Sequence, residues 1–304
     1  MQEQSTQPTP VSRTKVSMTM QVITIYCVCD DFLQASGWRD DVQARMTTAE
    51  VMTVSLVAAA IFDGNQEKSR RFLKEHGYIP AMLSKSQFNR RWHSIPETLW
   101  QEMLWVLGQA AQHTNPEKVY PEKVYAVDSV PVPVCHNIRI RRSRLIHRSR
   151  LYPLRAWGKE YRGYCASKKS YYYGLKGHLL ITADGRPVEF VLTPASAADI
   201  VGFRRLDLDL PANAYVMADA AYTDYEYEDL LREQEQITLL ADRKCNSKRP
   251  HPAHLRYLCQ MYRKRIETIF STLTGWLGRR LHAVTPQGWE RKVFLKVLAY
   301  ALLA

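Results

Sequence analysis

The chain has 304 residues, and 42 Lys and Arg against 30 Asp and Glu give it a formal net charge of +12. With 46% hydrophobic residues, 13 Gly and 15 Pro, its composition excludes a collagenous, coiled-coil or fully disordered chain. Six cysteines are too few for a disulfide scaffold, and the apolar stretches reach only about half of the roughly 20 residues that a membrane span needs. The polar N-terminus lacks the apolar segment of a secretory signal, so we expect a cytoplasmic protein with no membrane partner.

The first part of the chain has a helical pattern. Residues 1–16 are polar and rich in Ser, Thr and Pro, and we expect a disordered tail there. Residues 17–116 are predicted to be all-helical, and two capping boxes mark helix starts within them, at Thr47–Glu50 and at Ser84–Gln87. The first capping box precedes the apolar run 51–62, which predicts a buried helix.

Two of the expected helices are short and basic. One begins after Asn65 and ends before Gly77, and the other carries Arg90 and Arg91. Short helices with tight turns are compatible with a helix-turn-helix DNA-binding region, in which Arg90 and Arg91 are candidate DNA contacts. An ordinary helical bundle with solvated basic faces fits the same pattern equally well.

The pattern changes to strands in residues 117–304. Strands are predicted at 123–128, 171–181, 188–192, 214–219 and 237–241, and helices at 199–206, 224–234 and 255–277. Three antiparallel strands followed by alternating helices and strands are typical of a mixed sheet covered by helices. The predicted fold class is therefore α/β, with a mixed sheet.

The positive charge is concentrated in one segment. Between Arg139 and Lys176 there are twelve Lys and Arg residues and one acid, Glu160, which leaves the rest of the chain nearly neutral. This segment, an insertion at 136–170 and the strand after it, could be a solvated loop, but a run so dense in like charges favours a DNA phosphate backbone as partner. Its candidate DNA-binding residues are Arg139, Arg141, Arg142, Arg144, Arg148, Arg150, Lys168, Lys169 and Lys176.

Three carboxylates lie at informative places. Asp128 and Asp219 each end an apolar strand, and Glu267 lies on the long helix, four residues after Arg263. Two aspartates and a glutamate can hold two Mg²⁺ or Mn²⁺ ions about 3.5–4 Å apart, which clamp the attacking and leaving oxygens of a phosphodiester. Taken singly, each acid also fits a turn, a helix cap or a surface ion pair. Their order around a basic segment favours the metal site.

The segments around these acids resemble a known family. They are Ala126–Pro131, Tyr171–His178, Ala218–Tyr222 and Arg263–Glu267. The chain resembles bacterial insertion-sequence transposases of the DDE type, most of all the 982 group, over most of residues 45–300. This resemblance implies an RNase H-like catalytic core in which Asp128, Asp219 and Glu267 match the catalytic, metal-binding triad.

The resemblance also implies a function. A DDE transposase binds the terminal repeats of its element as double-stranded DNA, cleaves the ends and transfers them to target DNA, with Mg²⁺ or Mn²⁺ as cofactor. Because two DNA ends must be brought together, a homodimer on DNA is expected. The alternatives are a structure-selective RNase H-like nuclease, such as a resolvase, and a catalytically inactive DNA-binding regulator.

Two further residues have open interpretations. His178 alternates with Lys176 on one face of the predicted strand 171–181. The two residues form either a solvent-side pair or a contact, near Asp128, with DNA or with the groups that surround this carboxylate, and we favour the second. Arg263 is assigned to DNA because it precedes Glu267 by one helical turn.

Overall fold

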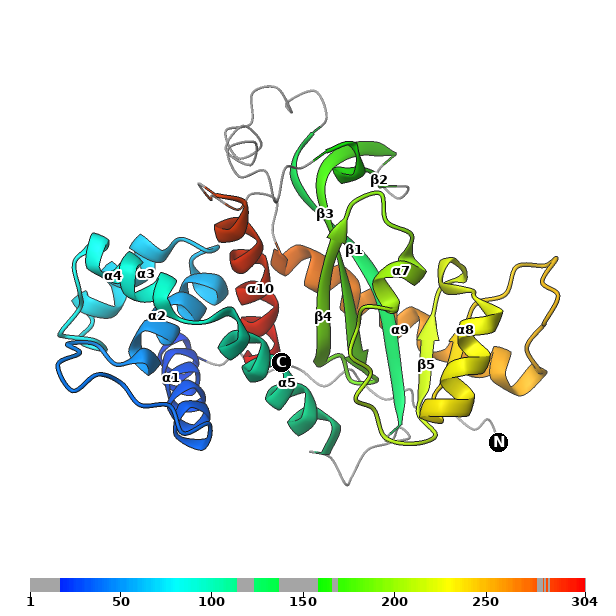
Figure 1. Ribbon diagram of the computed structural model, residues 1–304, viewed down its shortest axis with the longest axis horizontal. Helices are drawn as coiled ribbons and strands as arrows, with labels where there is room; N and C mark the ends of the chain where they lie inside the picture. Colours follow the sequence, from blue (N-terminus) through cyan, green and yellow to red (C-terminus); the bar gives the residue numbers. More distant parts are fainter. Residues whose placement is uncertain are drawn as a thin grey trace, which may run out of the picture.

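A computed structural model describes residues 17–113, 123–136, 158–165, 169–277, 281, 283 and 285–303, without the side chains of 264–266. Helices gather at one end of the molecule and a sheet forms the other, with one C-terminal helix between them (Figure 1). The N-terminal helices are α1 (Met18–Ala35), α2 (Thr48–Ile61), α3 (Gln66–Glu75), α4 (Lys85–Ser94) and α5 (Glu97–His113). None of the described helices is long and apolar enough to span a membrane.

Local capping fixes where two of these helices begin. Thr47 accepts a hydrogen bond from the backbone N–H of Glu50, and the Glu50 carboxylate accepts one from the N–H of Thr47, so α2 begins in a complete capping box. The same reciprocal pair at Ser84 and Gln87 begins α4. Both predicted helix starts are confirmed, because a capping box needs only residues three positions apart.

The sheet has six strands in the described part of the chain. They are β1 (Val124–His136), β2 (Arg162–Cys165), β3 (Ser170–Thr182), β4 (Pro187–Pro194), β5 (Tyr215–Ala218) and β6 (Thr238–Ala241). The order is β2-β3-β1-β5-β6, with β4 on the same edge of β3 as β2. Strands β1 to β4 pair antiparallel, whereas β1, β5 and β6 are parallel. This arrangement confirms the predicted mixed α/β fold and has the strand order of an RNase H-like core.

The predicted secondary structure needs correction at two strands and one helix. β1 continues to His136 rather than ending at Asp128, although it contains Pro131 and Pro133. Its pairing with β5 ends at Ala126, so beyond that point prolines can face an edge that needs no ladder hydrogen bond. β2 was not predicted, because its four residues lie inside the basic segment. The helix expected at 224–234 ends earlier and continues as a π-helical turn.

Helices cover both faces of the sheet. α9 (Ala253–Leu277) crosses behind the sheet in Figure 1, and α7 (Asp199–Phe203) lies in front of it. α8 (Tyr225–Leu230) belongs to the front side as well. The apolar residues divide accordingly, since alternate residues of each strand point to opposite faces. Ala126 and Met217 join the cluster with α9, whereas Val127 and Val216 join the cluster with α7.

The N-terminal helices and the sheet share one of these clusters. α10 (Pro286–Leu303) packs against α2, α5, α9 and β4. α5 also crosses β4 closely, because a Cβ on Gly108 would lie 2.6 Å from the carbonyl oxygen of Val188. The predicted division into a helical region ending at residue 116 and a catalytic domain beginning at 117 stays a prediction, since the apolar core is continuous across it.

Candidate active site

The strand register brings two of the predicted acids to the same level of the sheet. In the parallel pair β1–β5, Val124 lies beside Tyr215 and Ala126 beside Met217. Two residues further along each strand are Asp128 and Asp219. Alternation places both on the face that carries Ala126, Met217 and α9. Strand geometry therefore aligns the two carboxylates, although they are 91 residues apart in the chain.

Asp128 lies in an environment that disfavours its charge. Burial raises the pKa of its carboxyl to about 6, and the negative charges of Asp219 and Asp199 act in the same direction. A hydrogen bond of 2.7 Å from the backbone N–H of Ser129 and the positive charge of Lys176 oppose this shift. The carboxylate is thus short of positive charge nearby.

Asp219, which directly follows β5, also has little positive charge nearby to compensate its own. Its Oδ1 accepts a hydrogen bond of 2.8 Å from the N–H of Ala221, which caps the short 3₁₀ helix η4 (Ala220–Tyr222). Desolvation raises the pKa of Asp219, and the charges of Asp199 and Asp242 raise it further, while Arg263 lowers it. Two neighbouring carboxylates with raised pKa values form a site that a cation would stabilise.

The sequence reasoning missed Asp242. Ala218 pairs with Ala241 in the parallel pair β5–β6, so Asp242 directly follows β6 at the level of Asp219. Its backbone N–H donates to the carbonyl of Ala218 at 3.0 Å. Asp242 directly follows the predicted apolar strand 237–241, which is the pattern that identified Asp128 and Asp219. The same criterion would therefore have identified Asp242 from the sequence.

Glu267 forms an ion pair with an arginine and is not grouped with the two aspartates. The Nε of Arg263 lies 3.1 Å from Glu267 Oε1, and another nitrogen of the same guanidinium lies 2.9 Å from Asp242 Oδ2. The side chains of Arg263 and Glu267 are both more than 60% exposed on α9. Arg263 therefore links Glu267 to Asp242, which lies beside Asp219 at the end of β6.

The donor set fits a hard divalent cation only in part. Carboxylate oxygens are what Mg²⁺ and Mn²⁺ prefer, and Asp128 and Asp219 supply them side by side. Among the described residues, however, no three His, Cys, Asp or Glu side chains are grouped closely enough to hold a metal ion. The structure aligns two members of the predicted triad and leaves the third, Glu267, paired with Arg263.

Comparison with known proteins identifies the family that this geometry belongs to. Residues 120–302 match the transposase DDE domain, and that match covers β1 to α10 with all three predicted acids. The chain belongs to the transposase DDE domain family. No curated protein and no solved structure matches the chain. The family supports the transposase resemblance and divalent metal use in general, whereas the assignment to the 982 group stays a prediction.

Of the predicted DNA contacts in this DDE domain, His178 and Lys176 are engaged inside the protein. His178 is completely buried, and its Nε2 lies 2.8 Å from Thr193 Oγ1. The solvent-side interpretation is wrong, and a direct contact between its ring and DNA does not fit this burial. Lys176 donates to Asp199 at 3.0 Å and to the carbonyl of Ala197 at 2.9 Å, so its charge is already partly compensated.

The other predicted DNA contacts differ in their exposure and in whether they form ion pairs within the protein. Arg90 and Lys169 are exposed. Arg91 is half-buried and forms an ion pair with Asp40, which connects α4 to the segment before α2. Several predicted contacts lie outside the described residues: Arg139, Arg141, Arg142, Arg144, Arg148, Arg150 and Lys168.

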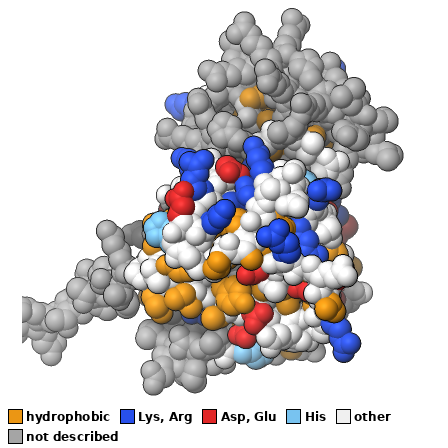
Figure 2. Space-filling model, turned by 90° about the vertical axis from the view of Figure 1, so that its left-hand side faces the viewer, with side chains coloured by type: hydrophobic (Ala, Val, Ile, Leu, Met, Phe, Trp, Pro, Cys, Tyr) orange, Lys and Arg blue, Asp and Glu red, His pale blue; other side chains and the backbone are white. Residues whose placement is uncertain are grey.

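The helical end of the molecule carries a basic surface of its own. Figure 2 shows this end with Lys and Arg side chains gathered in its upper half and apolar side chains in its lower half. The exposed basic residues of α3 and α4 are Lys68, Arg71, Lys74, Lys85 and Arg90. The exposed apolar residues of α1 are Met18, Met20, Ile23 and Tyr26. Of the two predicted DNA contacts on α4, Arg90 thus lies on an accessible cationic face, whereas Arg91 is paired with Asp40.

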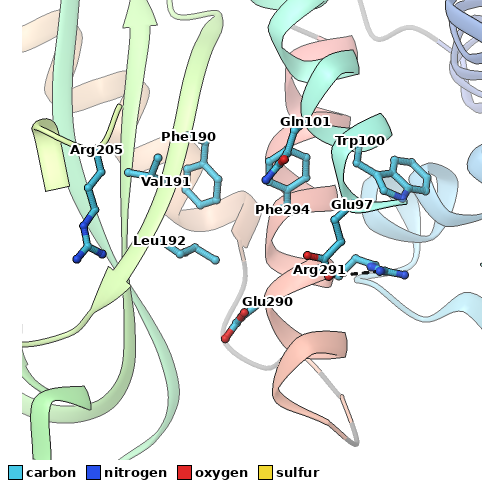
Figure 3. Close-up of a pocket in the computed structure, with 10 residues that line it drawn as sticks. All are labelled: Glu97, Trp100, Gln101, Phe190, Val191, Leu192, Arg205, Glu290, Arg291 and Phe294. Carbon is cyan, nitrogen blue, oxygen red and sulfur yellow. Dashed lines mark hydrogen bonds and ion pairs between the residues drawn. The ribbon is translucent and has the colours of Figure 1, made fainter. Parts of the chain in front are cut away.

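A cavity elsewhere in the molecule contains none of the predicted acids. It has a volume of about 340 Å³ and lies between β4, α5 and α10 (Figure 3). Phe190 and Phe294 face each other across it, with ring centroids 6.2 Å apart. Arg291 and Glu97 form an ion pair of 3.4 Å at one side. Its walls combine five apolar side chains with five polar or charged ones, and because none of the predicted acids is among them, we do not place the reaction there.

Proposed function

We propose that the chain is a DNA transposase that cleaves the ends of an insertion sequence and transfers the 3′ ends to target DNA. The observation that carries this proposal is the alignment of Asp128 on β1 with Asp219, which directly follows the neighbouring strand β5 of a DDE domain. Raised pKa values at both carboxyls support it, because the site lacks compensating positive charge. The further assignment to the 982 group of insertion sequences rests on the sequence resemblance.

Asp128, Asp219 and Glu267 would hold one or two Mg²⁺ or Mn²⁺ ions. Bound there, the metal supplies Lewis-acid stabilisation of the phosphodiester oxygens and lowers the pKa of a nucleophilic hydroxyl. Asp128 and Asp219 offer their oxygens from rigid strands, which fixes their separation. Glu267 would exchange its contact with Arg263 for a contact in the site, and Arg263, which also pairs with Asp242, would then offer its Nε side to a DNA phosphate.

The DNA partners follow from the distribution of charge. The basic segment between Arg139 and Lys176 interrupts the DDE domain and would bind phosphates of the terminal repeats or the target. The exposed cations of α3 and α4, Arg90 among them, would contact the same double-stranded DNA at the helical end. Transposition joins two element ends to one target, so we propose that the protein acts as a homodimer on DNA in the cytoplasm.

A strand-transfer assay tests the proposal directly. Labelled element ends, a plasmid target and Mg²⁺ are incubated with the full-length protein and with its Asp128→Asn, Asp219→Asn and Glu267→Gln variants. We expect joined products from the wild type and a loss of at least about 10³-fold in each variant, since each removes a charged metal ligand. Asp31→Asn changes an exposed acid on α1 and is the control.

Other outcomes would overturn the proposal. Cleavage without joining would instead support a structure-selective nuclease. Binding that persists without divalent metal, with no cleavage product, would support a regulator. Full activity in a variant that folds and binds DNA would exclude that carboxylate from the reaction.

A further inference from the structure

An exposed pair of tyrosines lies at the far end of the sheet. Tyr164 on β2 and Tyr171 on β3 are directly opposite each other in the antiparallel register. Their ring centroids are 4.8 Å apart with an interplanar angle of 49°, and the residues are 53% and 65% exposed. The next two tyrosines of β3, Tyr172 and Tyr173, are buried. The triple-tyrosine run therefore divides into two core residues and one that points to solvent.

Exposed cations frame this tyrosine pair. Arg162 precedes Tyr164 by two residues on β2, so strand alternation places both on one face. Lys169 lies in the turn that precedes β3, two residues before Tyr171. Both cations are exposed. The described acid nearest in sequence, Glu160, is also exposed, and its Oε1 accepts a hydrogen bond of 3.2 Å from the N–H of Gly158.

The tyrosines also share a face with the catalytic carboxylates. Asp128 is directly opposite Leu179 in the β1–β3 register, and directly opposed residues share a face. Tyr171 and Leu179 are separated by an even number of positions on β3, so they too lie on one face. Eight residues of strand at about 3.4 Å each place Tyr171 about 27 Å from the level of Asp128. That distance corresponds to roughly eight base pairs of duplex DNA at about 3.4 Å each, so DNA that reaches the tyrosines would flank the reaction site.

We propose that Tyr164 and Tyr171 form a stacking surface for unpaired bases of single-stranded DNA flanking the reaction site, with Arg162 and Lys169 binding the adjacent phosphates. Aromatic rings between cations are the usual chemistry of single-strand binding, since every base has a face that can stack on a ring. Paired bases of a duplex keep their faces covered by their neighbours. The proposal rests on the proposed function for its choice of DNA, and it concerns binding instead of the chemical step.

The test uses the full-length protein without divalent metal, so that binding is separated from cleavage. A single-stranded oligonucleotide containing 2-aminopurine reports stacking through fluorescence quenching, and a blunt duplex of the same length is the second probe. The informative variant is Tyr164→Leu/Tyr171→Leu, which keeps apolar side chains in the hairpin but removes both rings. Tyr164→Phe/Tyr171→Phe restores the rings. Tyr215→Ala removes a 37% exposed tyrosine elsewhere in the sheet and is the control.

We expect the leucine variant to bind the single strand at least about tenfold more weakly and to lose quenching, because stacking on each ring contributes substantially to affinity. The phenylalanine variant and Tyr215→Ala should bind like the wild type, and duplex binding should change less than about threefold in every variant. Unchanged single-strand binding in the leucine variant would overturn the proposal. So would an equal loss for duplex and single strand, a phenylalanine variant that fails to restore binding, or a change of oligomeric state in place of a change in binding.

The two proposals fail in distinguishable ways. If the wild type transfers strands but the leucine variant binds and quenches normally, only the stacking surface is wrong. If the leucine variant loses single-strand binding while the wild type gives no joined product, the stacking surface stands and the transposase function is wrong.

Discussion

Lys296, in the middle of α10, forms an ion pair with Asp63, a residue 233 positions earlier that follows α2. The Lys296 side chain is only 1% exposed, and its Nζ also donates to the carbonyls of Trp276 at 3.0 Å and Leu277 at 3.2 Å. Those carbonyls end α9, where a helix has no partners of its own for them. One amine thus connects the N-terminal helices, α9 and α10.

We expect Lys296→Met to destabilise the protein. Methionine fills similar space but leaves the last carbonyls of α9 without donors in a buried place, so the free energy of unfolding should fall by about 2–3 kcal/mol. Urea unfolding measures the change. Lys68→Met on the exposed side of α3 is the control, and we expect it to change the free energy by less than about 0.5 kcal/mol. An equal effect of both variants would contradict the role of Lys296.

Stability should also depend on Glu189. Burial of this β4 residue raises the pKa of its carboxyl to about 7, the charge of Asp207 adds to the shift, and a hydrogen bond from the N–H of Phe190 opposes it. The raised pKa means that the folded state holds the proton more tightly than the unfolded state. The contribution of Glu189 to stability is therefore fully present below the unfolded pKa of about 4.5 and is lost as the pH rises through about 7.

We expect Glu189→Gln to remove this pH dependence, because glutamine resembles the protonated acid. Near pH 4.5 the variant and the wild type should be equally stable, and at pH 8 the variant should be more stable by up to about 3 kcal/mol. Urea unfolding at several pH values measures the difference. Glu75→Gln, an exposed residue of α3, should show no such trend. A variant that is less stable than the wild type at pH 8 would show that the carboxylate is stabilised, not strained.

The parts of the fold that sequence predicted well depend on short-range chemistry. Capping boxes at Thr47 and Ser84 placed two helix starts because the partners are three residues apart. The ends of β1 and the presence of β2 depend on pairing with distant strands instead. The strand was predicted to end at Asp128, whereas β1 continues through Pro131, because beyond Ala126 it has no neighbour on the β5 side and proline is acceptable there. The ion pair of Lys296 with Asp63 joins residues that are far apart in sequence, so no local pattern predicts it.

The candidate site shows the same division. An acid after an apolar strand is a local pattern, so Asp128 and Asp219 were found from sequence, and their alignment follows from parallel pairing. The position of Asp242 beside Asp219 depends on the register of β5 with β6. His178 has the alternation of a surface residue, but α7 covers it, as a Cβ on Gly202 would lie 2.2 Å from its ring. The periodicity of a strand does not predict which of its residues a helix from elsewhere in the chain will cover.

Divalent metal should stabilise the protein through the aligned aspartates. A ligand that binds only the folded state raises the midpoint of thermal unfolding, and a concentration about tenfold above Kd should add about 3 °C. We expect Mg²⁺ or Mn²⁺ to have this effect on the wild type and not on Asp128→Asn or Asp219→Asn. Without metal, Asp128→Asn should be slightly more stable than the wild type, because the buried charge is gone. Differential scanning calorimetry with and without chelator measures both effects.

The Glu267→Gln variant shows, in the same experiment, whether the two aligned aspartates bind metal without the glutamate. Since Glu267 is paired with Arg263 in the structure, the two aspartates should retain part of the stabilisation by metal in this variant. A complete loss in Glu267→Gln would mean that the glutamate binds the first ion. No stabilisation of the wild type at any metal concentration would argue against a metal site at Asp128 and Asp219.

Arg263 should matter for activity and hardly for stability. Its contacts with Glu267 and Asp242 are exposed, and exposed ion pairs contribute only about 0–1 kcal/mol, so Arg263→Ala should shift the unfolding midpoint by no more than about 2 °C. Strand transfer should fall at least about tenfold, because the proposed contact of Arg263 with a DNA phosphate is lost. Arg263→Lys keeps the charge but not the two-pronged geometry, so we expect intermediate activity. Arg249→Ala, which breaks an exposed pair with Asp229, should leave transfer unchanged. Full strand transfer by Arg263→Ala would show that the arginine pairs with Glu267 without serving the reaction.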